Sequence, residues 1–226
     1  SYFSSLLNEA NRKLKGSYKL YLVSEEISPT DAIINHLFKN IDILSGQISK
    51  EPLDFYLYLV RGIHYAIVQD LDSALDDLSR AIDIKNDALA YFCRAVVRRK
   101  QFEVMSPNIQ PDYDKNRSTA KPDNKKILHE VELILRDYDR AIELSADFSF
   151  AYYNRANMLA RAKDYNAAIQ QYTEAIKSNS NFAEAYFNRG LTYIYSGERS
   201  KGIADLSKAG ELGIYDAYNL LKKITK

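Results

Sequence analysis

A short sequence pattern recurs along the chain at nearly constant spacing. Residues 149–156 read SFAYYNRA and residues 183–190 read AEAYFNRG, so these two copies begin 34 residues apart. Residues 88–95 read ALAYFCRA, and residues 55–62 read FYLYLVRG. A chain with such a period is built from stacked copies of one unit, because a single unit cannot bury its own apolar face.

Each copy contains two apolar patterns with the spacing of an α-helix. In the third copy, Tyr152 and Leu159 lie on one face of a first helix, and Ala168 and Tyr172 lie on one face of a second. A short turn separates the two patterns. In the fourth copy that turn contains Gly197, which favours a left-handed helix cap. The unit is therefore predicted to be a helix–turn–helix hairpin.

The residue types within the hairpin resemble those of the tetratricopeptide repeat, and of its bacterial members most closely. A large aromatic residue is followed by a small residue four positions later and, after three more, by a large apolar residue. The matching residues are Tyr58, Gly62, Tyr65, Ala74, Leu78 and Ala81 in the first copy, Tyr152, Ala156, Leu159, Ala168, Tyr172 and Ala175 in the third, and Tyr186, Gly190, Tyr193, Gly202, Leu206 and Ala209 in the fourth. The resemblance implies an all-α, right-handed superhelical solenoid of antiparallel helix pairs.

The repeats divide the chain into six expected segments. These are a degenerate N-terminal helix pair at 1–54, repeat 1 at 55–87, repeat 2 at 88–148, repeat 3 at 149–182, repeat 4 at 183–216 and a capping helix at 217–226. Repeat 2 carries a long insertion at about residues 102–126, which is polar and rich in turn-forming residues. Pro122 is expected to begin an unusually long second helix, since proline suits the first helical position.

Composition and motifs give no support to catalysis or to metal, cofactor or nucleic-acid binding. The formal net charge is +1, whereas proteins that bind polyanions usually carry a strong basic excess. His36, His64 and His129 are scattered, and Cys93 has no histidine close in sequence. His64 is expected to be a packing or surface residue, and Cys93 a half-buried thiol. No apolar run is long enough for a membrane span, and the compartment stays open.

An arginine recurs at one position of every first helix. The four residues are Arg61, Arg94, Arg155 and Arg189, and in matching register the second helices carry Asp77, Asp137, Gln171 and Asp205. Because arginine can bury its stem while its guanidinium meets a carboxylate, we expect a ladder of structural ion pairs rather than a ligand site. Gln171 interrupts this ladder in repeat 3.

The resemblance also implies a binding surface, since first helices of this family line a concave groove that binds peptides or protein segments. The lining residues expected in repeats 3 and 4 are Phe150, Tyr153, Asn154, Asn157, Arg161, Glu184, Phe187, Asn188, Leu191 and Tyr195. In repeats 1 and 2 they are Tyr56, Leu59, Val60, Ile63, Leu89, Phe92, Cys93 and Val96.

Asn154 and Asn188 occupy positions where an asparagine of a carboxylate clamp could lie, but the clamp lysines are missing. We expect both side chains to bind the backbone of a ligand and to take no part in packing between repeats. The predicted function is a non-enzymatic scaffold for protein–protein interaction. Two alternatives are a self-association module, which would form a homodimer, and a binding module for a carbohydrate or another small ligand, which the 18 tyrosines favour.

Overall fold

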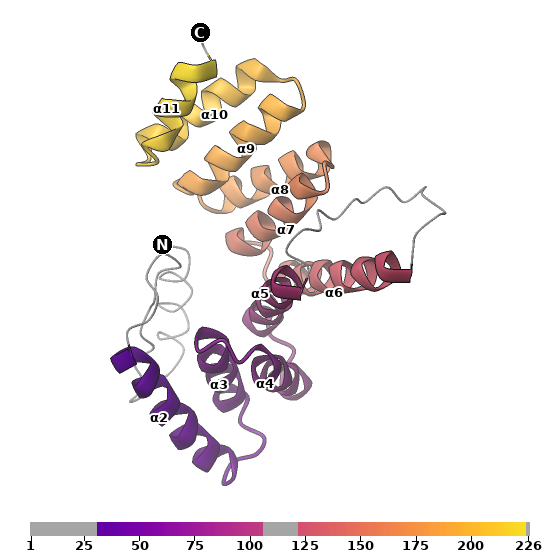
Figure 1. Cartoon of the computed structure of the whole chain (residues 1–226), viewed down its shortest axis with the longest axis vertical. Coiled ribbons are helices and arrows are strands. Elements are labelled where there is room, and N and C mark those ends of the chain that lie inside the picture. The colour runs from indigo at the N-terminus through magenta and orange to yellow at the C-terminus, as the bar shows by residue number, and fades with distance from the viewer. Residues whose placement is uncertain (1–30, 106–121, 225–226) are drawn as a thin grey trace. The chain divides into compact units, whose positions relative to one another are not determined.

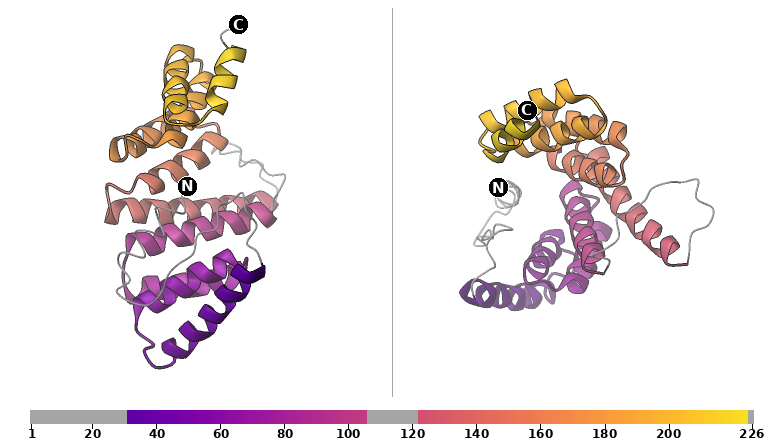
Figure 2. Two further views of the ribbon diagram at one scale, coloured as in Figure 1. Left: turned by 90° about the vertical axis from the view of Figure 1, so that its left-hand side faces the viewer. Right: turned by 45° about the horizontal axis from the view of Figure 1, so that its top comes forward.

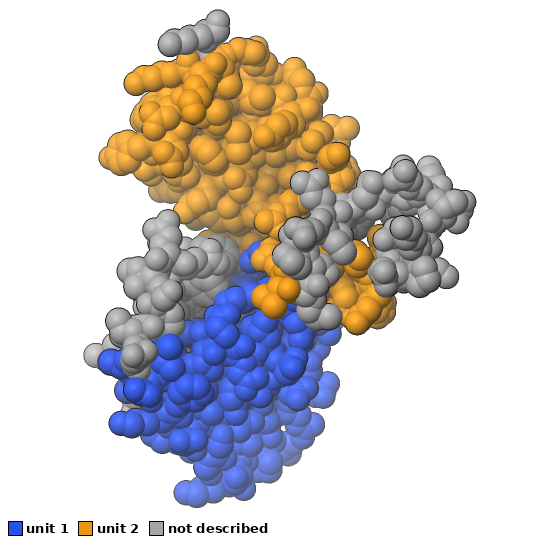
Figure 3. Space-filling view, viewed as in Figure 1, with its two compact units in different colours: residues 1–101 blue, residues 102–226 orange. Residues whose placement is uncertain are grey.

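The computed structural model describes residues 31–105 and 122–224, and within these ranges all regular secondary structure is helical. The chain forms two compact units, residues 1–101 and residues 102–226 (Figure 3). The first helix expected in the N-terminal pair lies outside the described residues. So does most of the expected insertion.

In unit 1, consecutive helices pack against one another. Its elements are α2 (Asp31–Ile48), α3 (Phe55–Ile67), α4 (Leu71–Ile84) and the part of α5 (Ala88–Met105) that ends at Gln101. Helices α3 and α4 form one hairpin, and α2 packs against α3 (Figure 1). The N-terminal ends of α3 and α4 are capped by Asp54 and Asp70, whose carboxylates accept hydrogen bonds from backbone N–H groups.

Unit 2 contains helix hairpins of the same kind. Its helices are α6 (Pro122–Leu144), α7 (Ser149–Arg161), α8 (Tyr165–Ser178), α9 (Ala183–Tyr195), α10 (Arg199–Glu211) and α11 (Asp216–Ile224). Each helix packs against the next, and α7 also contacts α9 (Figures 1 and 2). The α7–α8 and α9–α10 hairpins stack mainly through the contact of α8 with α9.

The residues at both ends of the expected insertion belong to helices and not to a turn. Helix α5 continues to Met105, and α6 is described from Pro122 onward, so residues 102–105 and 122–126 are helical. With 23 residues, α6 is longer than α8, which has 14. The described part of α6 thus includes Pro122, and whether the helix begins there stays a prediction.

The turns within hairpins share one backbone conformation. Gln69, Lys163 and Gly197 have φ angles of 68°, 61° and 91°, which lie in the left-handed region. After Lys163, the N–H of Asp164 donates to the carbonyl oxygen of Leu159 at 3.0 Å, which is the longer bond of a Schellman cap. The left-handed cap expected at Gly197 is confirmed, and two non-glycine residues adopt the same conformation.

Small residues lie where the two helices of a hairpin cross. In the α7–α8 hairpin, Ala156 and Ala168 are fully buried together. In the α9–α10 hairpin, a Cβ atom added to Gly202 would lie 2.7 Å from the carbonyl oxygen of Gly190. A backbone atom at that distance cannot be displaced cheaply, so the crossing requires glycine.

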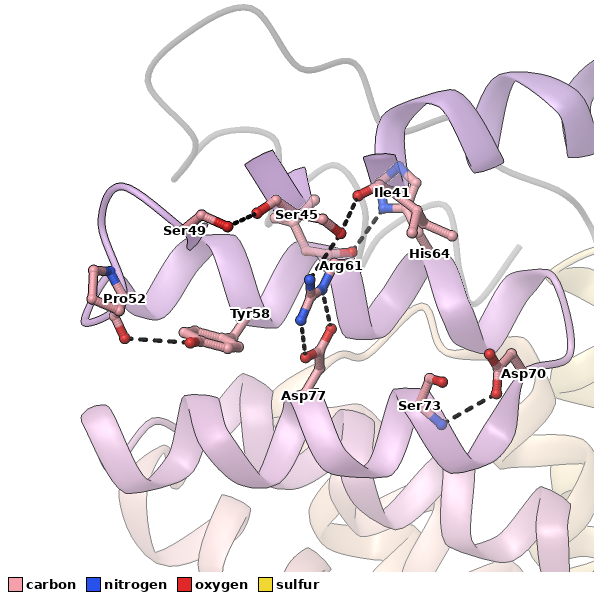
Figure 4. Close-up of polar contacts among 11 residues, drawn as sticks. Ile41, Ser45, Ser49, Pro52, Tyr58, Arg61, His64, Asp70, Ser73 and Asp77 are labelled. Atoms are coloured by element: carbon pink, nitrogen blue, oxygen red, sulfur yellow. Dashed lines mark hydrogen bonds and ion pairs between the residues drawn. The ribbon is translucent and has the colours of Figure 1, made fainter. Parts of the chain in front are cut away.

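The recurrent arginine joins three helices. Arg61 of α3 donates from Nε and Nη2 to the two carboxylate oxygens of Asp77 on α4, both at 2.7 Å, and from Nη1 to Oγ of Ser45 on α2 at 2.9 Å (Figure 4). The rings of Tyr58 and Tyr65, on the same helix, each have their centroid 5.8 Å from the guanidinium carbon. The charge is therefore held by a bidentate ion pair and by two aromatic faces.

Arg189 repeats this arrangement in unit 2. It donates to the two carboxylate oxygens of Asp205 at 2.6 and 2.9 Å, and to Oγ1 of Thr173 at 3.0 Å. The ring centroids of Tyr186 and Tyr193 lie 5.6 and 5.9 Å from its guanidinium carbon. The predicted pairing of arginine with the following second helix is confirmed for both Arg61 and Arg189.

Repeat 3 departs from this pattern. Arg155 donates from Nε to Oδ1 of Asp139 at 2.6 Å, and Asp139 belongs to the preceding helix α6. Gln171, on the following helix, makes no hydrogen bond to Arg155 in the described part of the chain. Arg155 thus pairs with a carboxylate on the preceding helix, because Gln171 on the following helix has none. Each recurrent arginine also has a partner on the preceding helix, which the sequence analysis missed. These partners are Ser45, Ser79, Asp139 and Thr173.

The helix crossing at Gly202 predicts opposite effects for two glycine substitutions. Gly202→Ala should lower the free energy of unfolding by about 1–3 kcal/mol, because its Cβ has no room. Gly46→Ala should raise that free energy by about 0.5–1 kcal/mol, because nothing lies within 4 Å of its Cβ and alanine favours helix. Denaturant unfolding of both variants measures these changes. Equal effects in the two variants would contradict the proposed crossing.

The arginine arrangement predicts that Arg189→Ala destabilises the chain by about 2–4 kcal/mol, because the carboxylate of Asp205 loses its partner while 11% exposed. Lys208→Ala, on the same helix as Asp205, removes an ion pair whose side chains are 46% and 61% exposed. That control should change the stability by less than about 1 kcal/mol. Thermal unfolding of the two variants provides the comparison, and a similar cost in both would show that Arg189 is not a structural link.

Candidate functional site

Four side chains from three helices form a polar network, which we call the asparagine network: Tyr153 and Asn157 on α7, Tyr172 on α8 and Asn188 on α9. The hydroxyl of Tyr172 donates to Oδ1 of Asn157 at 2.6 Å. Nδ2 of Asn188 donates to the same oxygen and to the hydroxyl of Tyr153, both at 2.9 Å. Burial raises the pKa of Tyr172 well above its usual value, so its hydroxyl remains a donor.

The network leaves two amide groups without partners among the described residues. Oδ1 of Asn157 accepts two hydrogen bonds, but its Nδ2 donates none. Nδ2 of Asn188 donates two hydrogen bonds, but its Oδ1 accepts none. Both residues are half-buried, so these groups can still meet a ligand or water. A free donor and a free acceptor therefore lie on two neighbouring first helices, at orientations set by the tyrosines.

Aromatic rings adjoin the network at Tyr153. The ring centroid of Phe182, which precedes α9, lies 5.1 Å from that of Phe150 and 4.8 Å from that of Tyr153. Phe182 is buried, whereas Phe150 and Tyr153 are half-buried. Phe187 packs against the cluster formed by α10 and α11 and is also half-buried. These rings thus combine packing between repeats with an exposed edge.

The C-terminal ends of α7 and α9 carry two exposed residues of the expected lining, Arg161 and Tyr195. Arg161 forms an ion pair with Glu103 at 2.8 Å, in which the two side chains are 64% and 37% exposed. Tyr195 is 69% exposed, and its ring stacks on that of Tyr165 with centroids 6.1 Å apart. Of the other two expected residues, Glu184 is exposed and Leu191 is half-buried.

The expectation that Asn154 and Asn188 stay out of the packing is wrong for both residues. Asn154 is only 6% exposed, so its side chain is not available to a ligand on this surface. Asn188 bonds to two residues of the preceding hairpin. Helical spacing could not distinguish these outcomes, because both positions lie near the boundary between the packed and the open side of the first helix.

Half of the lining expected in repeats 1 and 2 is core, whereas Tyr56 is exposed and Ile63 and Val96 are half-buried. Leu59, Val60, Leu89 and Phe92 are between 1% and 7% exposed. Apolar side chains at these positions gain free energy by packing. Cys93 is half-buried, as expected.

Burial affects both Cys93 and His64, two of the titratable residues considered in the sequence analysis. Burial raises the pKa of the Cys93 thiol to about 12, so the thiol is protonated at neutral pH. Of the two environments expected for His64, packing or surface, the structure has the first, with 2% exposure. Among the described residues, no group of three or more His, Cys, Asp or Glu side chains is placed to hold a metal ion. None of the described helices is both long and apolar enough to cross a membrane.

Two protein-family models match parts of the sequence. A family model described as TPR repeat matches residues 156–197, and one described as tetratricopeptide repeat matches residues 183–212. No curated protein matches the chain.

Several solved structures have a similar fold. A crystal structure of MamA is 18% identical, with a TM-score of 0.62 over 87% of this chain and 99% of that one. A MamA structure from Desulfovibrio magneticus RS-1 is 12% identical, with a TM-score of 0.61 over 94% and 95%. The C-terminal part of a TPR repeat-containing protein from Cytophaga hutchinsonii is 17% identical, with a TM-score of 0.60 over 82% and 66%. At these identities the likeness concerns the fold alone.

Proposed function

Because the chain is a tetratricopeptide-repeat protein, we propose that it is a non-enzymatic interaction scaffold that binds an extended peptide or protein segment across α7 and α9. Repeats of this family serve as scaffolds for protein–protein interaction. The observation that carries the proposal is the pair of unpartnered amide groups, Oδ1 of Asn188 and Nδ2 of Asn157. One accepts from a backbone N–H of the ligand, and the other donates to a backbone carbonyl.

The asparagine network prepares both amides for this role. Asn157 is held by Tyr172, and Asn188 is held by Tyr153 and by Asn157 itself. Side chains that are already fixed lose little conformational freedom when a ligand binds, so more of the interaction energy appears as affinity. The hydrogen bonds within the protein thus support those to the ligand.

The neighbouring rings supply apolar contacts. Phe150, Tyr153 and Phe187 are each half-buried, so their exposed edges can cover apolar side chains of the bound segment. Arg161 and Glu184 add one charge of each sign on the same two helices. An extended segment with alternating apolar side chains fits this composition. Asn154 has no part in the proposal, because it is buried.

A second candidate is a carbohydrate or another flat small ligand. It is favoured by the stacked rings of Tyr165 and Tyr195, since Tyr195 is 69% exposed and presents an aromatic face to solvent. A glycan array tested beside a peptide library separates the two candidates. Binding to glycans that Tyr195→Ala abolishes, without any peptide binding, would favour the second.

The proposed contact predicts that Asn157→Asp weakens peptide binding by about tenfold or more. The aspartate keeps an acceptor for Tyr172 and Asn188, but it replaces the free Nδ2 donor by a charged oxygen that repels a ligand carbonyl. The probe is a peptide selected against the full chain from a random library displayed on phage, and calorimetric titration measures its affinity.

Asn166→Asp is the matched control for this experiment. It makes the same chemical change on α8, at an exposed position away from the asparagine network, and should leave the affinity unchanged. Melting curves of both variants verify that the fold is intact. Unchanged affinity in Asn157→Asp would place the binding surface elsewhere on the chain.

A further inference from the structure

The junction between α2 and α3 combines an apolar contact with two polar contacts. On α2, Leu37, Ile41 and Leu44 are between 1% and 5% exposed. The first polar contact is the hydrogen bond from Arg61 to Ser45 described above. The second joins Nδ2 of Asn40 on α2 to Nε2 of His64 on α3 at 3.4 Å. Helix α2 is therefore attached to α3 partly through a histidine.

The hydrogen bonds of His64 require a neutral ring. Nδ1 lies 2.7 Å from the carbonyl oxygen of Val60, which can only accept, so Nδ1 carries the proton. Nε2 is then unprotonated and accepts from the amide of Asn40. With 2% of its surface exposed, His64 is shielded from water. Each ring nitrogen thus has a partner that suits the neutral form.

Packing alone does not demand a histidine at this position. The equivalent residues of the other first helices are Val97, Met158 and Thr192, which are 4%, 5% and 3% exposed. All three are buried, and none can ionise. Among the four equivalent positions, the one that faces α2 therefore carries the only side chain that can gain a charge near neutral pH.

We propose that His64 makes the docking of α2 on α3 sensitive to pH: a proton gained at Nε2 in mildly acidic solution weakens this junction and releases α2, while the hairpins of unit 2 remain intact. Release uncovers the apolar surface that Leu37, Ile41 and Leu44 cover. The apolar surface beneath α2 is therefore exposed to solvent more often below neutral pH than above it.

The surroundings of His64 oppose its positive charge. A protonated Nε2 would point its N–H at the N–H₂ group of Asn40. Rotation of that amide would offer an acceptor but would leave the charge shielded from water. On α2, the charge of His36 also opposes a positive charge on His64. Near His64 on α3, the charge of Arg61 is neutralised by Asp77 of α4.

These effects set the direction of the pH dependence. Burial lowers the pKa of His64 below its ordinary value of 6.5, the hydrogen bond to Val60 opposes that shift, and the charge of His36 adds to it. In the separated state, His64 titrates near its ordinary pKa. Docking is therefore strongest above pH 6.5 and weakens as the pH falls from there toward the lowered pKa. At pH 5.5 the docking equilibrium constant can fall by up to about tenfold.

Hydrogen exchange of the full chain, measured by mass spectrometry at pH 7.5 and pH 5.5, tests the proposal. After correction for the intrinsic pH dependence of exchange, the protection of α2 amides should fall by up to about tenfold at pH 5.5. The protection of α9 and α10 should not fall. Equal protection of α2 at the two pH values would overturn the proposal.

His64→Met is the decisive variant, because repeat 3 has methionine at the equivalent buried position. Its α2 protection should be the same at both pH values, and an unchanged pH dependence would also overturn the proposal. His36→Gln is the control and should retain most of the dependence, since burial is the main cause. If His64→Met fails to fold, nuclear magnetic resonance of the wild-type imidazole decides. His64 must then titrate together with the loss of α2 protection, and titration of a docked α2 would refute the switch.

Discussion

A half-buried guanidinium, paired between neighbouring helices, is the interaction on which the rest of this fold depends. Arg189 meets Asp205 on one side and Thr173 on the other, and the tyrosines of its own helix cover its faces. A charge held this way tolerates little displacement, because any partner that moves leaves a desolvated group unpaired. The arginine thus sets where a first helix lies relative to the helices before and after it.

The small residues at the helix crossings help to keep the arginine and its carboxylate partner together. Gly190 follows Arg189 directly, and a Cβ at Gly190 would lie 3.2 Å from the Cβ of Asp205 and 3.0 Å from Leu206. A larger residue there would push α10 away and separate Asp205 from the guanidinium. The close crossing and the ion pair therefore support each other, which explains why the motif ends in arginine followed by glycine or alanine.

The asparagine network is a consequence of this regular stacking. Asn188 reaches Asn157 across 31 residues of sequence only because α9 lies against α7 in a fixed register. At two positions the repeats differ in the chemical type of the side chain. In repeat 3, Asp139 takes over the role of the missing carboxylate, and in repeat 1, His64 replaces an uncharged side chain.

The sequence by itself determined the helix pairs, the left-handed turn at Gly197, the small residues at the crossings and the pairing of Arg61 with Asp77 and of Arg189 with Asp205. Each follows from local spacing, because residues within one hairpin keep the same offset in repeats 1, 3 and 4. The tertiary structure alone decided that Asn154 is buried, that Asn188 bonds to the preceding hairpin and that Arg155 pairs with Asp139. Helical periodicity tells which side of a helix a residue occupies, but the neighbour it meets depends on how closely the hairpins stack.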